Sequence, residues 1–173
     1  ELFCGKVHIN LKKKYKNIIS IIIPRHIHRA QEIKEELNQI GLNVYMHSSN
    51  KNIPNNTDIY LVDTFGETKS FLKLSKIAFM GKSIHGHGGQ NPIEAATLGN
   101  RIIHGPNIEN FVEVYDFLEK LGISTKIKSY KDLEKLIIKF NRKKNYSNQI
   151  IKKLAYTGKQ ILFNNEKEIN KYF

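Results

Sequence analysis

The chain has 173 residues, with 40% hydrophobic and 10% aromatic side chains and a net charge of +12. This length and composition are sufficient for an ordinary globular domain with a core of its own. No apolar run approaches the roughly 18 residues of a membrane-spanning helix, and the first residues show no basic-then-apolar secretory signal. Cys4 is the only cysteine, which excludes an intrachain disulfide and favours a reducing compartment.

The positive charge is concentrated towards the C-terminus. Residues 122–173 hold 13 of the 28 Lys and Arg residues but only 4 of the 16 Asp and Glu residues, in runs such as Arg142–Lys144 and Lys152–Lys153. Three explanations stay open for this surface: a solvated face, attraction to anionic membrane lipids, and binding of nucleic acid.

The hydrophobic pattern alternates between helices and strands in chain order. Strands are predicted at residues 18–23, 42–46, 59–62, 77–80, 101–104 and 123–127, and helices at 1–16, 27–39, 67–74, after Asn91, at 108–121 and from 128 onward, with a break near 141–147. Gly41 and Gly122 are expected to end the helices before them. Residues 48–57 are predicted to form a polar loop. This order predicts an α/β fold with a Rossmann-like open parallel sheet and helices on both faces.

A glycine-rich loop leads into one of the predicted helices. Gly86, Gly88 and Gly89 remove side chains where a ligand can approach the backbone. Asn91 is a candidate N-cap, and Pro92 suits a first helical turn. With Glu94 on that turn, the loop and helix predict a site where amides face a phosphate and a carboxylate takes sugar hydroxyls. A tight turn into a packing helix is the alternative.

The order of residues in this region is similar to the nucleotide-sugar signature of GT-B glycosyltransferases, and within them to the 3-deoxy-D-manno-octulosonic acid (Kdo) transferases. Three further blocks resemble the same family in the same order: the strand and Pro-Arg-His at residues 21–26, Asp-Thr-Phe-Gly-Glu at 63–67, and the strand with Gly-x-Ser at 77–83. The fold implied is the C-terminal, donor-binding domain of a GT-B enzyme, with its first strand missing. One domain over residues 1–173 is expected, with a helical extension over 145–173.

The resemblance implies a set of residues that bind the CMP-linked donor. Its members are Pro24, Arg25, Gly66, Glu67, Thr68, Asn91, Pro92, Ile93 and Glu94, with His26, Ser83, Gly88 and Gly89 in support. From the residues alone, Arg25 offers a planar fork to a phosphate or carboxylate, or is a surface arginine after a strand. Glu67 is equally explained as a carboxylate at a helix N-terminus, and Ser83 as part of a simple turn.

The chain departs from the family pattern at three positions. Gln90 stands where members usually carry histidine, Thr68 replaces a small apolar residue, and Lys82 replaces a second glycine. The pairs His26 and His28, and His85 and His87, lack a carboxylate or cysteine at ligand spacing, so no metal site is expected. His104 is expected at a strand end. A metal-independent reaction without cofactor is expected.

The resemblance implies an inverting transfer of Kdo from CMP-Kdo to a lipid A precursor, lipid IVA, in lipopolysaccharide biosynthesis at the cytoplasmic face of the bacterial inner membrane. The base and the acceptor site belong to an N-terminal domain in that family. No catalytic residue is therefore expected in this chain, which is expected to be an inactive fragment of the full enzyme.

Two rival functions remain. A different GT-B enzyme that uses a UDP-sugar would have a similar donor loop and first-turn glutamate. A non-enzymatic basic domain that binds nucleic acid would explain the charge, but not the four motif blocks, and no aromatic stacking motif is present. Nucleic acid is therefore not expected as a partner.

Overall fold

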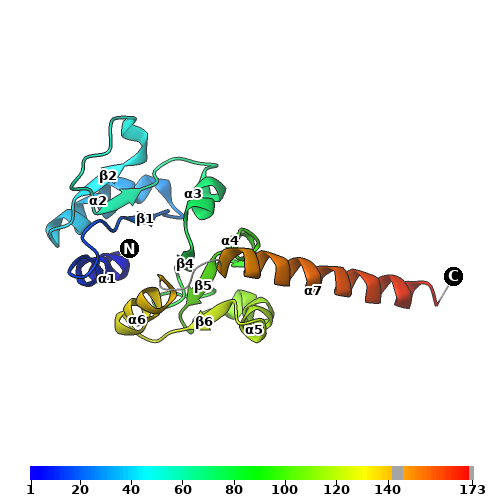
Figure 1. Cartoon of the computed structure of the whole chain (residues 1–173). Helices are drawn as coiled ribbons and strands as arrows, with labels where there is room; N and C mark the ends of the chain where they lie inside the picture. Colours follow the sequence, from blue (N-terminus) through cyan, green and yellow to red (C-terminus); the bar gives the residue numbers. More distant parts are fainter. Residues whose placement is uncertain (142–145, 172–173) are drawn as a thin grey trace. The chain divides into compact units, whose positions relative to one another are not determined.

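The structure, a computed structural model, describes residues 1–141 and 146–171 (Figure 1). These residues form two compact units. The first comprises residues 1–71 and 129–138, and the second residues 72–128 together with the described part of 139–173. Each unit has its own parallel sheet and hydrophobic core, and the basic run Arg142–Lys144 lies outside the described residues.

The first unit is built on three short parallel strands in the order β1 (Ser20–Ile22), β3 (Ile59–Leu61), β2 (Val44–Met46). Residues of both outer strands pair with Tyr60, Ile21 from β1 and Tyr45 from β2. Helices α1 (Leu2–Lys12) and α2 (Ala30–Gln39) pack on each other and contribute to the core. That core consists of Ile22, Ala30, Ile33, Leu37, Leu42, Ile59 and Leu61.

The second unit has the strand order β4 (Ile77–Phe79), β5 (Arg101–His104), β6 (Ser124–Lys126), again parallel throughout. The central strand β5 is buried along its whole length. Helix α4 (Ile93–Thr97) contacts β5, and α5 (Val112–Lys120) contacts β6. Helix α7 (Tyr146–Ile169) packs on α4. The core consists of Ala95, Ala96, Ile102, Ile108, Tyr115, Leu118, Ile123 and Ile150.

The predicted parallel α/β fold is confirmed, and so are all six predicted strands. Helices α3 (Thr68–Leu74) and α6 (Tyr130–Asn141) also lie where they were expected. Gly41 and Gly122 follow the C-cap residues of the helices they end and have left-handed backbone angles, φ +85° and +69°, because glycine alone enters this conformation without steric cost. The strands are divided between two sheets by their hydrogen bonds rather than joined in one.

Two local expectations were wrong. Helix α1 ends at Lys12, not at residue 16, and a turn leads from its last residues to β1. The segment after β2 begins with the 3-10 helix η2 (His47–Ser49) rather than directly as a loop. Two further 3-10 turns, η1 (Ile27–Arg29) and η3 (Glu109–Phe111), form the first turns of the predicted helices 27–39 and 108–121.

Within the second unit, a buried arginine links the sheet to the C-terminal helices. Arg101 starts β5 and is 8% exposed. Its guanidinium carbon lies 3.9 Å from the ring centre of Phe140 and 3.3 Å from that of Tyr146. Such stacking compensates part of the cost of burying the charge.

No helix among the described residues is long and apolar enough to cross a membrane.

Candidate functional site

In the first unit, the predicted donor residues follow two neighbouring parallel strands. Pro24 is buried just after β1, and Arg25 and His26 are exposed beyond it. Gly66 and Glu67 follow β3, where Gly66 has φ +86°. Since the carboxyl ends of parallel strands share one edge of a sheet, both groups belong to the edge where ligands bind in such folds.

Glu67 is held by side chains from two other positions on this edge. Thr64 Oγ1 donates a hydrogen bond to Glu67 Oε2, and His47 Nε2 lies 2.9 Å from the same oxygen. These contacts, with that from Thr64 the larger, keep the pKa of Glu67 below its usual range. The carboxylate is therefore ionised and oriented at neutral pH, as binding of sugar hydroxyls requires. Thr68, the first residue of α3, is exposed.

Asp63 ties the 3-10 helix η2 to the loop after β3. Its carboxylate accepts hydrogen bonds from the backbone nitrogen of Ser48, at 2.8 Å, and from the Ser48 hydroxyl. Partial burial alone would raise the pKa of Asp63, but these bonds and nearby His47 outweigh it and lower the pKa. The loops on this edge are thus joined by charge-assisted hydrogen bonds, which are the stronger kind.

In the second unit, the glycine loop is fastened to the segment that follows β5. Ser83 is fully buried; its hydroxyl donates to the Met80 carbonyl at 2.5 Å and accepts from the Gly105 amide at 2.8 Å. Asn107 donates from its side chain to the carbonyls of Ile84 and Gly86. The Ser83 hydroxyl thus uses its proton and an acceptor position on backbone groups, so its role in the structure is to hold the loop.

The glycines of this loop have a steric reason to be glycine. Gly86, Gly88 and Gly89 have φ of +111°, +87° and +66°. A Cβ on Gly88 would lie 2.5 Å from Asn110 Nδ2, and one on Gly89 would lie 3.0 Å from the Asn107 carbonyl oxygen. The left-handed angles favour glycine independently of any ligand.

Lys82 adopts the same unusual backbone conformation without being glycine. Its φ is +59°, in the left-handed region that costs an L-residue with a side chain roughly 1–2 kcal/mol. This explains physically why the related pattern has glycine at that position.

The predicted helix start is present but shifted by one residue. Helix α4 begins at Ile93, with Pro92 at the N-cap position, and the Asn91 side chain accepts a hydrogen bond from the Ile93 amide at 3.0 Å. Asn91 therefore does the work of a cap from one residue further out. Glu94 is exposed on the first turn, as predicted. The helix has only five residues, so its macrodipole is small and direct backbone contacts matter more.

Four residues near these positions were missed at the sequence level. Glu109 accepts a hydrogen bond from the Gly88 amide at 2.7 Å. One of the loop amides that were expected to bind an anion is therefore already bonded to a carboxylate of the chain itself. Asn107, described above, and His47 and Tyr60 complete the group. His47 directly follows a predicted strand, and its position at a carboxyl end was the available signal.

The remaining histidines do not form a metal centre in the part of the chain that the structure describes. His104 ends β5, as expected; it is buried, with Nε2 3.0 Å from Glu119 and its ring 4.2 Å from that of Tyr115. The rings of His26 and His28 lie 5.5 Å apart.

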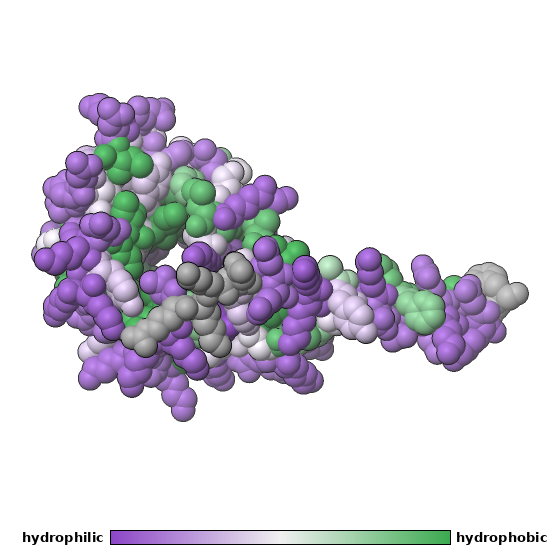
Figure 2. Space-filling model, viewed as in Figure 1, coloured by the Kyte–Doolittle hydropathy of each residue, from purple (hydrophilic) through white to green (hydrophobic). Residues whose placement is uncertain are grey.

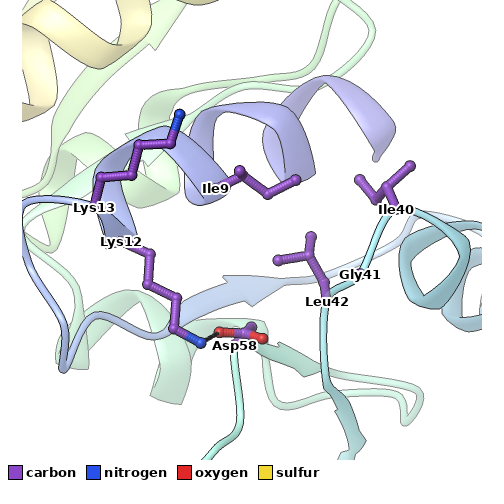
Figure 3. A pocket seen from close by; sticks show the side chains of 7 residues that line it. All are labelled: Ile9, Lys12, Lys13, Ile40, Gly41, Leu42 and Asp58. Carbon is purple, nitrogen blue, oxygen red and sulfur yellow. Dashed lines mark hydrogen bonds and ion pairs between the residues drawn. The ribbon is translucent and has the colours of Figure 1, made fainter.

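A pocket of about 360 Å³ lies at the opposite, amino-terminal edge of the first sheet (Figure 3). Apolar side chains line part of it, and Lys12 reaches across to Asp58 while Lys13 points away from that carboxylate. Asp58 neutralises Lys12, whereas Lys13 donates a hydrogen bond to the uncharged side chain of Asn10. The lining residues are Ile9, Lys12, Lys13, Ile40, Gly41, Leu42 and Asp58.

Comparisons with known proteins agree with the motifs. A 3-deoxy-D-manno-octulosonic acid transferase of Rickettsia prowazekii is 31% identical over 162 residues, which are 92% of this chain and 34% of that protein. The enzyme of the same name from Haemophilus influenzae is 34% identical over 65% of the chain and 26% of its own length. The chain belongs to the Kdo transferase family.

Further comparisons define the extent of this Kdo transferase segment. A probable mitochondrial Kdo transferase of Arabidopsis thaliana is 33% identical over 70% of the chain and 29% of its own length. The chain thus spans about a quarter to a third of these relatives. No family model matches it. The crystal structure of the C-terminal CMP-Kdo binding domain of WaaA from Acinetobacter baumannii matches 87% of the chain and 79% of that domain, with a TM-score of 0.78 and 22% identity. The two share the fold of a GT-B C-terminal domain.

Proposed function

We propose that the chain is the donor-binding part of an inverting glycosyltransferase that moves Kdo from CMP-Kdo to a lipid A precursor. The observation that carries this proposal is the match of 92% of the chain to a Kdo transferase of Rickettsia prowazekii, with the motif residues after the strands of parallel sheets. The same fold occurs in a domain described as binding CMP-Kdo.

In the proposed mechanism, the residues of this chain stabilise the departing CMP. In the first unit, the Arg25 guanidinium would take phosphate charge and Glu67 a ribose hydroxyl. In the second unit, Glu94 would take ribose hydroxyls, and the amides of the glycine loop other than that of Gly88, which Glu109 already binds, would take phosphate charge. Fixed donors of this kind stabilise developing negative charge without reorganising during the reaction. They need no metal ion for that task. The acceptor and the general base are assigned to the part of the enzyme outside this chain, so no turnover of CMP-Kdo and lipid IVA is expected from the chain by itself.

The test is a two-dimensional amide NMR titration with CMP, run beside UMP and AMP. We expect shifts at Arg25, Gly66, Glu67 and the 88–94 segment, largest with CMP. Replacing Glu94 with Gln should weaken CMP binding about fivefold to twentyfold, because it removes a charged hydrogen-bond acceptor. The control is Glu113→Gln, at an exposed site on α5, which should leave binding unchanged. A preference for UMP would favour the UDP-sugar alternative, and equal shifts with all three nucleotides would contradict a cytidine site.

We further propose that the basic C-terminal helix attracts the enzyme to an anionic membrane surface at the cytoplasmic side of the inner membrane. Helix α7 carries lysines together with apolar side chains that are more than half exposed, among them Leu162 and Phe163 at 63% and 62%. On the visible face, α7 shows apolar patches between hydrophilic ones (Figure 2). Such a combination suits a surface of anionic lipids.

This membrane proposal is checked by co-sedimentation with vesicles. The chain is expected to bind vesicles that contain phosphatidylglycerol, to release them as salt is raised, and to ignore phosphatidylcholine vesicles. Replacing Lys152 and Lys153 with Gln should reduce binding severalfold, while replacing Lys34 and Lys73 in the same way should not do so beyond the loss of net charge. Stronger binding to an oligonucleotide than to the anionic vesicles would instead favour the nucleic-acid alternative.

A further inference from the structure

His47 contacts the Glu67 carboxylate but has no role in the mechanism proposed above. His47 starts η2, immediately after β2. Its Nδ1 lies 2.6 Å from the hydroxyl oxygen of Tyr60 in the adjacent strand β3, and its Nε2 lies 2.9 Å from Glu67 Oε2. The ring also meets Phe71 of α3 edge-on, with centroids 5.4 Å apart. Contacts with Tyr60 of β3, with Glu67 just before α3 and with Phe71 of α3 therefore fix the imidazole between a phenol and a carboxylate.

Tyr60, His47 and Glu67 are joined by hydrogen bonds in which His47 is the donor to Glu67. In a neutral imidazole, a proton on Nε2 is donated to the carboxylate, and Nδ1 then accepts from the Tyr60 hydroxyl. If the ring is protonated, Nδ1–H donates to the Tyr60 oxygen instead, and the Nε2 bond to Glu67 is retained. The phenol fits both states, so the histidine always donates to Glu67.

The effect on Glu67 is to fix one of its two oxygens. His47 and Thr64 both address Oε2, which is consistent with Oε1 serving a ligand. His47 is 23% exposed and the Glu67 side chain 42% exposed, so the histidine lies deeper than the carboxylate that it contacts. Outer partners of this kind are how binding groups are held in productive geometry.

We propose that His47 is a positioning residue for donor binding, which orients the Glu67 carboxylate and is itself fixed by Tyr60. The proposal rests on the assignment of Glu67 to the donor site. His47 acts through Glu67 and does not itself contact the donor. The ionisable groups around it are Glu67, Asp63 and Tyr60, with Tyr45 packed against Tyr60 at 5.3 Å between ring centres.

The test compares His47→Leu, His47→Gln and Tyr60→Phe by two readouts. The first, without ligand, is the pKa of Glu67 followed by carbon NMR of its carboxyl group. We expect this pKa to rise in His47→Leu, because a donor to the carboxylate is lost, and to return towards the original value in His47→Gln, whose amide can donate in place of Nε2. Tyr60→Phe should give an intermediate value, since the ring packing stays and only the hydroxyl that fixes His47 is removed.

The second readout is CMP affinity measured on the same variants. His47→Leu is expected to weaken binding about fivefold to tenfold, and His47→Gln to recover most of the loss. Tyr45→Phe is the matched control, because its hydroxyl contacts the Lys51 carbonyl and not His47; it should change neither readout. Unchanged CMP affinity in His47→Leu, with the unaltered chain binding CMP, would overturn the positioning role alone. Failure of the unaltered chain to bind CMP would overturn the donor site, and this inference with it.

Discussion

Replacing Gly105 with Ala is expected to destabilise the second unit by about 3 kcal/mol or more, at the upper end of overpacking effects. A Cβ at this position would overlap the carbonyl oxygen of Ser83 and lie 2.5 Å from its carbonyl carbon. Both atoms belong to backbone, so a rotamer change cannot relieve the clash. The same glycine donates its amide to the Ser83 hydroxyl, and any shift that makes room would break this bond.

Unfolding in urea, followed by circular dichroism, measures the effect on stability. Amide hydrogen exchange locates the destabilised residues. The amides of Gly105 and Asn107, which donate to Ser83, should lose protection. Gly158→Ala is the matched control, because this glycine lies in α7 with nothing within 4 Å of a Cβ. Alanine is the better helix former by about 1 kcal/mol, so the control should be slightly stabilising. Equal stability of the two variants would contradict the close approach of the loop to β5.

Replacing Asp58 with Asn is expected to cost the first unit about 2–4 kcal/mol, because it removes the charge and one of the two carboxylate oxygens that serve four donors, one of them on the buried His8. The Asp58 carboxylate accepts from the backbone and side chain of Asn43, at 2.9 and 3.2 Å. It also contacts Lys12 and lies 3.4 Å from Nε2 of the fully buried His8. Asp116→Asn, at an exposed site on α5, is the control, and urea unfolding of both variants is the measurement.

The same cluster predicts acid sensitivity in two pH ranges. Burial lowers the pKa of His8, against the opposing effect of Asp58. The unfolded chain therefore binds a proton at this position more readily, and stability falls as the pH drops below about 6.5, the ordinary histidine value. Burial of Asp58 is outweighed by the bonds from Asn43 and Lys12, so its pKa is also lowered. Its contribution is present above about 3.8, the ordinary carboxyl value, and is lost as the pH falls through the lower folded value.

The histidine part of this pH dependence is checked with His8→Gln. Unfolding free energies between pH 7.5 and 5 should decline for the unaltered chain and be flatter for this variant, which has no group to titrate there. The outcome that contradicts the explanation is an equal decline in both chains.

The sequence by itself determined the fold class, because buried β-branched runs and helical periodicity depend only on local order along the chain. The strand at residues 18–23 and the helix ended by Gly41 illustrate this, as each follows from side-chain pattern and backbone sterics. The family was also determined at this level. Its four motif blocks are short and contiguous, and relatives about 30% identical over most of the chain confirm it.

Only the tertiary structure decided which residues hold the site residues in place. His47 and Tyr60 are 13 positions apart and meet because β2 and β3 are neighbours. Ser83 and Gly105, 22 positions apart, meet because β4 and β5 pair. Such contacts depend on strand order and register, and these are set by packing between segments rather than by the pattern within any one of them.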